Sequence, residues 1–283
     1  MARRIAAFLV VLLLPVCSFA QLSVDDINNL KQQAIDEGWT FEVTQNPATE
    51  YSLDQLCGLV EPPDWKKNAR FVDFASTKDL PPSFDWRDQG LPVVKNQGGC
   101  GSCWAFATVG PLECNIMLQD GIEVNLSEQF LVSCNSSGWD CGGGWFAHDY
   151  HQWHSGPCGD TGAVMEADFP YVAWDAPCGC PYPSREYVIH DWAYIGSSGG
   201  VPPESYIKQA ILDYGPVSVA VYANGAMQSY GGGVFNGCAT GTINHAVTLV
   251  GWDDTDGPGV WIMRNSWGTG WGEDGGYMRI PYY

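Results

Sequence analysis

The number and placement of cysteines constrain this chain more than any other feature of its sequence. The 283 residues include eleven cysteines, and nine of these lie between Cys100 and Cys238. Cysteine at this density is typical of chains that fold in an oxidising compartment and are crosslinked by disulfides. Because nine is an odd number, we expect eight of these cysteines to pair and one thiol to stay free for chemistry.

The N-terminus has the order of segments found in a secretory signal peptide. Arg3 and Arg4 precede an apolar run over residues 5–16, and small residues follow as far as Ala20. Segments in this order direct a chain into the secretory pathway and are then removed. The run is shorter than the about 20 apolar residues that a membrane-spanning helix needs. We therefore expect residues 1–20 to be a signal peptide, and the product to have no membrane anchor.

The chain is strongly acidic. It has 13 Lys and Arg against 32 Asp and Glu, and its formal net charge of −19 at pH 7 becomes −21 once the two arginines of residues 1–20 are removed. Such a charge argues against nucleic acid as a partner, because phosphate binding depends on Lys and Arg. A low working pH would neutralise part of the Asp and Glu charge and reduce self-repulsion. The expected location is therefore the extracellular space or an acidic lysosomal or vacuolar lumen.

The chain divides into a sparse N-terminal segment and a larger body. Residues 24–35 have helix-like spacing of apolar side chains, but the rest of residues 21–79 is polar and loosely patterned. From Leu80 onward glycine, tryptophan and cysteine become dense, and about 200 residues suffice for a full hydrophobic core. We expect residues 80–283 to fold around a core and residues 21–79 to be too thin to hold one alone.

The body has a helical half followed by a strand-rich half. Apolar side chains recur at helical spacing from Cys103 to Gln119, which predicts a buried helix, and the hydroxyl of Ser127 can cap a second helix. Short apolar runs broken by glycine follow Pro216 and predict antiparallel strands. These runs cover residues 217–222, 245–252, 259–264 and 276–280. A helical half followed by a sheet half indicates the α+β class, with a cleft between the halves.

Cys103 is the candidate nucleophile. It begins the predicted apolar helix and follows a glycine-rich stretch that starts at Gln97. A thiol at a helix N-terminus lies near the positive end of the helix dipole and near unpaired backbone N–H groups, which favour the thiolate. The same N–H groups can stabilise the oxyanion that forms when a thiolate attacks a carbonyl. One turn of chain could thus supply both the nucleophile and half of an oxyanion hole.

His245 is the candidate general base. Imidazole is suited to this task because its pKa lies near the working pH, and His245 opens an apolar strand that can hold the ring rigidly. Twenty residues further on, the amide of Asn265 could accept a proton from the imidazole and fix its tautomer, with Trp267 placed to keep water off that bond. Together these residues predict a Cys-His-Asn triad.

With these residues the sequence resembles the papain family of cysteine proteases, and the resemblance extends from about Pro82 to Ile280. The stretch Cys100-Gly101-Ser102-Cys103-Trp104 carries the first resemblance, and His245 lies 142 residues beyond Cys103. Further matches occur in the order that the family has them. They are Phe84-Asp85-Trp86-Arg87, Asn125-Leu126-Ser127-Glu128-Gln129, Cys141-Gly142-Gly143-Gly144, Phe169-Pro170-Tyr171, Gly215-Pro216-Val217-Ser218-Val219 and Asn265-Ser266-Trp267-Gly268.

The resemblance implies a papain-like two-domain fold, with a helical left domain, an antiparallel β-barrel-like right domain and the active-site cleft between them. It implies peptide-bond hydrolysis through a thioester acyl-enzyme, without a cofactor or metal. Cys103, His245, Asn265 and Gln97 would be catalytic, and the side chain of Gln97 would donate to the oxyanion beside the backbone N–H of Cys103. Endopeptidase action is expected, because the histidine-bearing loop of cathepsin B has no counterpart between Tyr171 and Tyr187.

The resemblance also maps a substrate-binding cleft. Gly143 and Gly144 would offer backbone hydrogen bonds to an extended peptide. An apolar specificity pocket would accept a bulky hydrophobic side chain two residues before the scissile bond. Its expected lining is Trp145, Phe146, Ala220, Ile243 and Ala246, with Trp267 also counted among the binding residues. The sequence ends 18 residues beyond Asn265, so the usual C-terminal floor of the pocket is expected to be missing or replaced.

By the same resemblance, disulfides are expected between Cys100 and Cys141, and between Cys134 and either Cys178 or Cys180. Cys114, Cys158, Cys238 and the remaining member of the Cys178/Cys180 pair are left unassigned.

Residues 21–79 resemble the short inhibitory propeptide of the cathepsin B type, on the basis of Trp39 and Leu56-Cys57-Gly58. The strand around Cys57 would lie through the cleft in the reverse direction and block it until cleavage between about Thr77 and Pro82. The expected partners are protein or peptide substrates, the chain's own propeptide and inhibitors of the cystatin type. The protein is expected to be a monomer.

Two other classes of function have some support in the sequence. A catalytically silent binding or inhibitory relative would be expected to have lost Cys103, His245 or Gln97, and none of these is lost. A zinc site is suggested by His148, His151 and His154, spaced by three, together with Cys141 or Cys158. Disulfides and surface helices explain those residues more simply, so no metal is expected.

Overall fold

The computed structural model describes residues 21–74, 79–157, 159, 161–181, 187–255 and 257–282. The expected signal peptide, Cys158 and part of the expected propeptide cleavage region lie outside these ranges. No helix within them is both long enough and apolar enough to cross a membrane.

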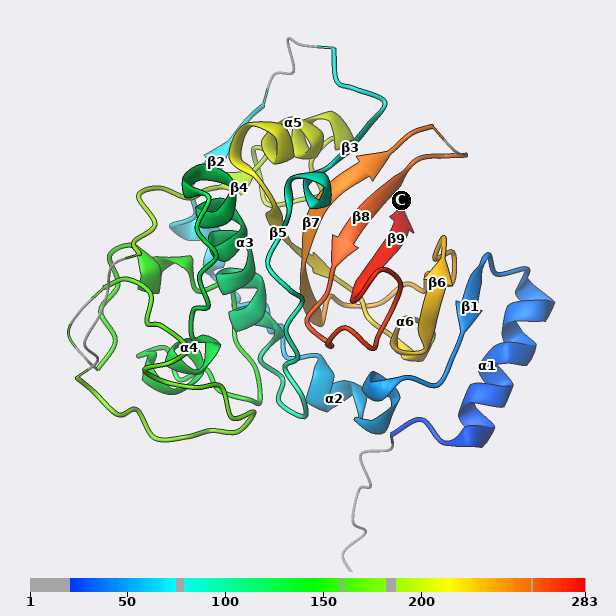
Figure 1. The fold of residues 1–283 in the computed structure, drawn as a ribbon, viewed down its shortest axis with the longest axis horizontal. Coiled ribbons are helices and arrows are strands. Elements are labelled where there is room, and N and C mark those ends of the chain that lie inside the picture. Colours follow the sequence, from blue (N-terminus) through cyan, green and yellow to red (C-terminus); the bar gives the residue numbers. More distant parts are fainter. Residues whose placement is uncertain are drawn as a thin grey trace, which may run out of the picture.

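The described chain contains helices and strands in mixed order (Figure 1). The α-helices are α1 (Val24–Glu37), α2 (Leu53–Leu56), α3 (Cys103–Asp120), α4 (Glu128–Cys134), α5 (Glu204–Tyr214) and α6 (Gly225–Gln228). The 3₁₀ helices are η1 (Pro47–Glu50), η2 (Trp65–Lys67), η3 (Trp86–Gln89) and η4 (His148–His151). The strands are β1 (Phe41–Val43), β2 (Phe71–Val72), β3 (Ser83–Asp85), β4 (Tyr194–Ile195), β5 (Val217–Val221), β6 (Tyr230–Gly233), β7 (His245–Asp253), β8 (Val260–Arg264) and β9 (Tyr277–Pro281).

Helix α3 lies at the centre of the molecule, against the five-stranded sheet (Figure 1). Most of its side chains are buried, as expected for a helix that is apolar on nearly all faces. It ends where Gly121 adopts a left-handed conformation with φ of 67°, which glycine adopts without steric cost. The helix begins at Cys103, the residue at which the sequence pattern predicts it to begin. Its N-terminus faces the sheet half, because α3 packs on β5 and β7.

The sheet half is an antiparallel arrangement built around β7. Strand β5 pairs with the first part of β7, so that Val221 lies opposite His245 and Ala220 opposite Ala246. Strand β3 pairs with the last part of β7, and β8 and then β9 continue the sheet on the other side. The register places His245 at the end of β7 that faces α3.

The two largest hydrophobic cores among the described residues correspond to the two halves. One core contains α3 and α4 side chains such as Trp104 and Phe130, and the other contains Trp252 of β7 and Trp271 of the connection between β8 and β9. In the first, the hydroxyl of Ser127 caps α4 by accepting a hydrogen bond from the N–H of Phe130 at 3.0 Å, as the sequence predicts. A helical half packed on an antiparallel sheet half confirms the expected α+β fold class.

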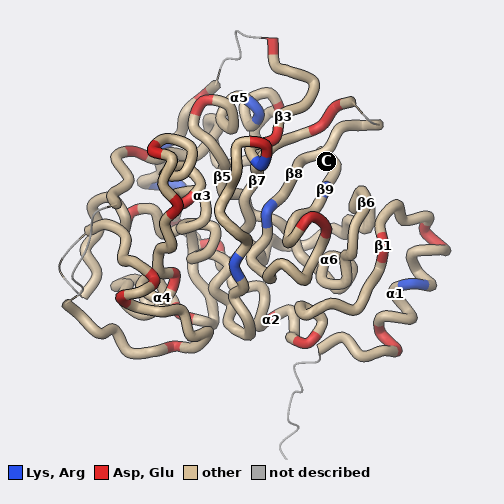
Figure 2. The backbone as a smooth tube through the Cα atoms, viewed as in Figure 1, with Lys and Arg blue, Asp and Glu red and all other residues tan. Residues whose placement is uncertain are grey.

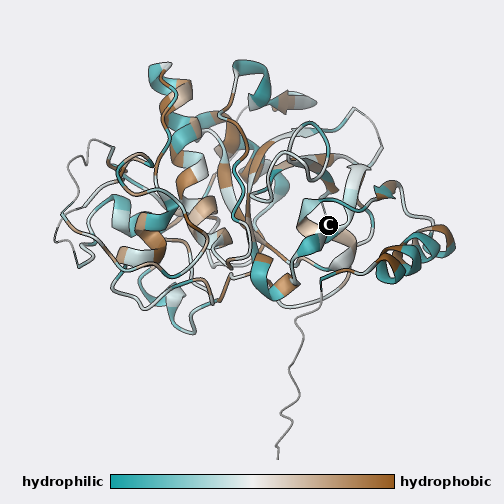
Figure 3. Ribbon diagram, turned by 60° about the horizontal axis from the view of Figure 1, so that its bottom comes forward, coloured by the Kyte–Doolittle hydropathy of each residue, from teal (hydrophilic) through white to brown (hydrophobic). Residues whose placement is uncertain are grey.

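Residues 21–74 lie along the other parts of the chain. Helix α1 is capped by Ser23 and carries one buried side chain, Ile27; Figure 3 shows this helix at the edge of the molecule with hydrophilic and hydrophobic residues alternating along it. Strand β1 then pairs with β6, and the parallel pair β2–β4 ties the end of the segment to the chain beyond α4. Residues 21–74 therefore pack on the rest of the protein, because they have too few apolar side chains to form a core of their own.

The acidic residues are spread over the traced chain, and few Lys or Arg lie among them (Figure 2). Several of the basic side chains are paired with carboxylates. Lys208, which is largely buried, contacts Asp254 at 2.7 Å, and the partly buried Arg87 contacts Asp85 at 2.7 Å. The remaining negative charge therefore has little local compensation at neutral pH.

The number of paired cysteines differs from the eight that the sequence predicts. The structure contains the disulfides Cys100–Cys141 and Cys134–Cys178, and the sulfur of Cys180 lies 3.3 Å from that of Cys178. Cys114 and Cys238 carry free thiols, so the expectation of eight paired cysteines is wrong. Cys114 is enclosed in α3 and Cys238 lies on an exposed loop, so neither meets a partner.

Candidate active site

Cys103 occupies the first position of α3 and is completely buried. Its sulfur lies among backbone N–H groups from three parts of the chain, those of Trp104, of Ala246 and of the consecutive residues Gly58 and Leu59. Ala246 follows His245 directly, so the sulfur lies where the helix N-terminus meets the start of β7. The fold thus brings together the two residues that the sequence selects as nucleophile and base.

The imidazole of His245 is held by Asn265. Its Nε2 lies 2.8 Å from Oδ1 of Asn265, which fixes Nε2 as the protonated nitrogen when the ring is neutral. The ring of Trp267 packs over the imidazole with centroids 4.7 Å apart, and Trp267 is 1% exposed. Nδ1 of His245 has no hydrogen-bond partner among the residues that the structure describes. This nitrogen is therefore available to exchange a proton with a nucleophile.

Burial dominates the ionisation of both groups. It raises the pKa of the Cys103 thiol to about 11, although the surrounding N–H groups act to lower it. It lowers the pKa of His245 to about 4, although the hydrogen bond that the imidazole donates to Asn265 and the backbone of Leu56 act to raise it. In this covered state the pair is a neutral thiol and a neutral imidazole. The thiolate expected from the helix dipole alone is therefore not the favoured form, because desolvation outweighs the dipole.

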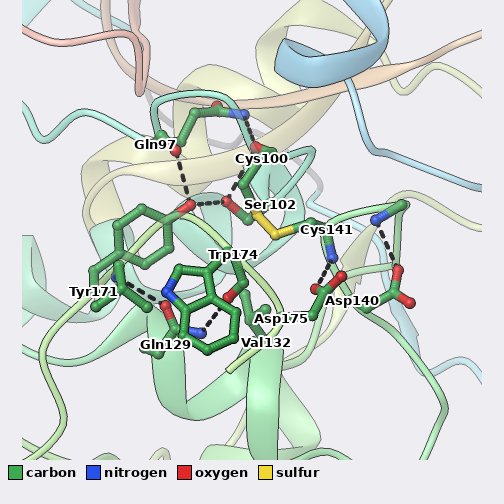
Figure 4. The surroundings of a disulfide bond; sticks show 12 residues. Gln97, Cys100, Ser102, Gln129, Val132, Asp140, Cys141, Tyr171, Trp174 and Asp175 are labelled. Atoms are coloured by element: carbon green, nitrogen blue, oxygen red, sulfur yellow. Dashed lines mark hydrogen bonds between the residues drawn. A yellow bond between two sulfur atoms is a disulfide. The ribbon is translucent and has the colours of Figure 1, made fainter. Parts of the chain in front are cut away.

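Gln97 is fixed beside Cys103 by contacts on both ends of its amide. Its Nε2 donates to the carbonyls of Leu56 and Cys100, each at 2.9 Å, and its Oε1 accepts from the hydroxyl of Ser266 at 2.7 Å. The hydroxyl of Tyr171 donates to the backbone carbonyl of Gln97 at 2.8 Å (Figure 4). The side-chain N–H groups of Gln97 are therefore aimed at a carbonyl that lies over the helix N-terminus.

Residues 56–60 lie directly over this site. The N–H of Gly58 donates to the sulfur of Cys103 at 3.3 Å, and the N–H of Leu59 donates to the carbonyl of Asn244 at 2.9 Å. Gly144 makes two backbone hydrogen bonds to the segment, accepting from Val60 and donating to Gly58, both at 2.9 Å. The resulting bridge between Leu59 and Gly144 is parallel. The segment therefore blocks access to Cys103.

The residues expected to line the specificity pocket lie in the same hydrophobic core as Leu59. Leu59 is 4% exposed and belongs to one apolar cluster with all five residues expected to line the specificity pocket. These are Trp145, Phe146, Ala220, Ile243 and Ala246. Gly143 lies against Val60, and a side chain on Gly144 would collide with Trp104 at 2.6 Å. Trp267 lies apart from this cluster, in the other core beside His245.

Ser266 and Tyr171 support the site, although the sequence alone does not predict a role for either. Both lie within motifs that carry the family resemblance. Ser266, within Asn265-Ser266-Trp267-Gly268, orients Gln97, and Tyr171, within Phe169-Pro170-Tyr171, contacts both Gln97 and Ser102. Figure 4 shows Tyr171 lying between these two residues, next to the Cys100–Cys141 disulfide. The hydroxyl group that each residue carries within its motif is the sequence signal that could have identified Ser266 and Tyr171.

A buried ionic cluster lies behind the site. Nζ of Lys95 contacts Oε1 of Glu113 at 2.7 Å and Oε1 of Glu128 at 2.9 Å, and both carboxyl groups are almost fully buried. Lys95 is two residues before Gln97, and Glu113 also accepts from the backbone N–H of Leu126 at 2.7 Å. Burial raises the pKa of Glu128, against the opposing effect of the nearby ammonium group of Lys95. The cluster anchors the loop that carries Gln97.

The histidines considered for zinc do not converge. His148 packs on Phe146 and Trp192, whereas Nε2 of His154 lies 2.9 Å from the hydroxyl of Ser136. Among the described residues, the one group of His, Cys, Asp or Glu close enough to share a metal is Cys134, Cys178 and Cys180. Two of those three sulfurs already form a disulfide. The histidine spacing is thus accounted for by packing.

Comparison with known proteins gives the family. Residues 80–282 match the model of the papain family cysteine proteases. Ananain from Ananas comosus is 33% identical over 267 residues, which cover 92% of this chain and 74% of ananain. Cathepsin S from Bos taurus is 33% identical over 251 residues, covering 85% of this chain and 73% of cathepsin S. Fruit bromelain from Ananas comosus is 36% identical over 211 residues, but these are 57% of its length.

Solved structures give the same result. The digestive procathepsin L2 proteinase of the Tenebrio molitor larval midgut superposes with a TM-score of 0.77 at 31% identity, covering 92% of this chain and 86% of that one. The recombinant stem bromelain precursor superposes with a TM-score of 0.72 at 32% identity, covering 93% and 83%. The chain belongs to the papain family and is a cysteine-type endopeptidase by that membership. Its fold is that of the precursor forms, in which the protein carries its own inhibitory segment.

Proposed function

We propose that residues 80–283 form an endopeptidase that is secreted or delivered to a lysosomal or vacuolar lumen, with residues 1–20 as signal peptide and residues 21–79 as inhibitory propeptide. Protein and peptide chains are its substrates, and inhibitors of the cystatin type would compete for the same cleft. The enzyme acts as a monomer.

The observation that carries this proposal is the way in which residues 56–60 are held. Gln97 donates to a carbonyl of the segment, Gly144 bonds its main chain in strand fashion, and Leu59 enters an apolar cluster at the expected pocket. Each of these groups is one that a substrate would need: an oxyanion donor, a backbone partner and a specificity pocket. The segment thus occupies the site in the manner of a bound peptide that is not cleaved.

The proposed reaction begins when the propeptide leaves. Cys103 transfers its proton to Nδ1 of His245 and its sulfur attacks the scissile carbonyl carbon. The backbone N–H of Cys103 and Nε2 of Gln97 stabilise the oxyanion of the tetrahedral intermediate. His245 protonates the leaving amine, so that the C–N bond breaks and a thioester remains. Water then attacks the thioester as His245 accepts a proton, and the acid product departs with the thiol restored.

The pocket favours a bulky hydrophobic side chain at the second residue before the scissile bond. Leu59 is the guide to its size, because a leucine of the covering segment is 4% exposed within the hydrophobic core that also includes Ala220, Ile243 and Ala246. Full burial of such a side chain contributes about 1.5–3 kcal/mol relative to exposure. A charged residue in its place would lose that contribution and would add a desolvation penalty.

Acidification of the purified full-length chain, followed by labelling with a thiol-directed epoxide and mass spectrometry, tests this function. We expect loss of about 60 residues between the signal peptide and the body, judged from where the weakly patterned sequence ends, and one adduct at Cys103. Cys103→Ser should abolish both peptide hydrolysis and labelling. Cys238→Ser is the matched control, because Cys238 is an exposed free thiol away from the site. Hydrolysis that survives in Cys103→Ser would refute the mechanism.

A further inference from the structure

The chain contains two acceptor motifs for N-linked glycans, each an asparagine followed two residues later by serine. They are Asn125-Leu126-Ser127 and Asn135-Ser136-Ser137. A motif of this kind is modified in chains that enter the secretory pathway, and the bulky glycan must lie at the surface of the folded protein. The two motifs have the same pattern, so the surroundings of their side-chain amides must distinguish them.

Asn125 lies in the connection between α3 and α4, where the backbone is fixed and the side chain is exposed. Val124 is 6% exposed and Leu126 is fully buried, so successive side chains alternate between the interior and the solvent. The backbone carbonyl of Asn125 accepts a hydrogen bond from the N–H of Glu166 at 2.9 Å. The side-chain amide of Asn125 makes no hydrogen bond to any residue in the described ranges. Its Nδ2 is therefore available for modification.

Asn135 is in the opposite situation, because its amide holds the turn that follows α4. Nδ2 donates to the carbonyls of Leu131, Val132 and Trp139 at 2.8, 3.2 and 2.6 Å. Oδ1 accepts from the N–H groups of Ser137 and Trp139, each at 3.0 Å. A glycan would replace one of the two hydrogens of Nδ2 with a carbon atom, although three carbonyl oxygens already surround this nitrogen. The native turn therefore has no room for a glycan on this residue.

We propose that Asn125 carries an N-linked glycan in the secreted protein and that Asn135 carries none. The glycan donor is a lipid pyrophosphate-linked oligosaccharide of the secretory pathway. Nδ2 of Asn125 loses a proton and bonds to C1 of the first sugar, as the bond from C1 to the pyrophosphate oxygen breaks and the lipid pyrophosphate leaves. Transfer takes place before folding is complete, and a chain modified at Asn135 cannot then form the native turn. The proposal rests on the secretory location in the proposed function.

The modified residue lies away from the active site. The N–H of Leu126, the residue after Asn125, donates to Glu113 at 2.7 Å. Glu113 is ten residues further along α3 than Cys103, and at about 1.5 Å per residue the two positions are about 15 Å apart along the helix. A glycan on Asn125 therefore leaves the cleft accessible to a substrate.

The test uses residues 21–283 carrying Cys103→Ser, secreted from a eukaryotic host behind a signal peptide of that host. Glycans are released with a peptide N-glycosidase in heavy-oxygen water, which converts each modified asparagine to aspartate and labels it. Peptide mass mapping then locates the label. We expect label at position 125 and none at position 135. Label at position 135, or no label at either position, would overturn the proposal.

Three variants check the reason for the difference between the two motifs. Asn125→Gln should remove the glycan, and Ser137→Ala, which abolishes the second motif but keeps the amide of Asn135, should leave the glycan in place. Asn135→Asp keeps Oδ1 but removes the donor Nδ2, so we expect a several-fold lower secreted yield than for Ser137→Ala. Equal yields for these two variants would overturn the structural role of the Asn135 amide.

The host signal peptide separates this proposal from the proposed function. The same mapping on the chain with its own residues 1–20 tests the secretory location. Label at position 125 with the host signal, but none with the native one, would refute the proposed location and leave the glycan site supported. No label at position 125 in a chain secreted by either signal peptide would overturn the glycan site and leave the peptidase proposal untouched.

Discussion

The backbone N–H of Gly58 donates a hydrogen bond to the sulfur of Cys103 at 3.3 Å, and this contact defines the state of the protein. Gly58 belongs to the segment of residues 56–60 that covers Cys103, so the same segment both buries the sulfur and donates an N–H group to it. In the proposed function this covered state is the latent form, and the segment must leave before a substrate can reach the sulfur.

The close approach of Gly58 predicts a strong requirement for glycine. A Cβ atom at this position would lie 1.7 Å from the carbonyl oxygen of Gly101, so Gly58→Ala must push the propeptide away from Cys103. We expect the variant zymogen to show faster self-activation at neutral pH and faster epoxide labelling of Cys103. Gly200→Ala is the control, because a Cβ there meets only the hydroxyl of Ser198, at 3.9 Å. Unchanged latency in Gly58→Ala would show that the contact does not hold the proform closed.

The buried imidazole predicts how acid acts on the proform. Burial lowers the pKa of His245 to about 4 from an ordinary value of 6.5. A depressed pKa contributes stability above pH 6.5, and this contribution is lost as the pH falls toward 4. At 1.36 kcal/mol for each pKa unit, the loss is up to about 3 kcal/mol.

Chemical unfolding of the Cys103→Ser proform from pH 7 to pH 4, beside the same protein carrying His245→Gln, measures this effect. The variant cannot gain a proton at position 245, so its free energy of unfolding should fall less steeply over this range. Parallel pH profiles for the two proteins would exclude His245 as the acid-sensitive group. The same comparison applied to self-activation would connect the loss of stability with release of the propeptide.

The anchoring of Gln97 predicts a graded series of activity losses. Gln97→Ala removes the side-chain donor of the proposed oxyanion hole, and loss of one such donor lowers kcat by about 10²–10³-fold. Ser266→Ala keeps the donor but removes the hydrogen bond to its Oε1, so we expect a smaller loss and little change in KM. Steady-state kinetics of the mature variants on one leucine-containing peptide would check the order. A loss in Ser266→Ala equal to that in Gln97→Ala would contradict a purely orienting role.

The ionic cluster behind the site predicts a large cost for removing its single cation. Lys95→Met would leave the buried carboxyl groups of Glu113 and Glu128 without their cation, and breaking a buried ion pair in this way costs about 3–5 kcal/mol. Lys67→Met removes an ion pair with Asp64 in which both side chains are about 70% exposed, where the cost should be below about 1 kcal/mol. Equilibrium unfolding of both variants measures the difference. A small effect for Lys95→Met would show that the cluster is wetter than its burial suggests.

Much of the architecture could be predicted because it follows from local patterns. The expected helix from Cys103 to Gln119 corresponds to α3, which runs one residue further, and the four apolar runs correspond to β5, β7, β8 and β9 within one or two residues. Helix α5 was not predicted, although Ile207, Ala210 and Ile211 have helical spacing. The sequence signal there was obscured by the flanking glycines and prolines, which favour a loop assignment.

The sequence by itself determined which residues meet at the candidate site. The positions of Cys103 at the start of an apolar helix, of His245 at the start of a strand and of Asn265 directly after a strand follow from hydrophobic period and glycine placement, which are local properties. The ionisation of the thiol and imidazole and the path of residues 56–60 were decided only by the tertiary structure. Each of these depends on burial, and burial arises from contacts between segments far apart in the chain, which a linear pattern does not record.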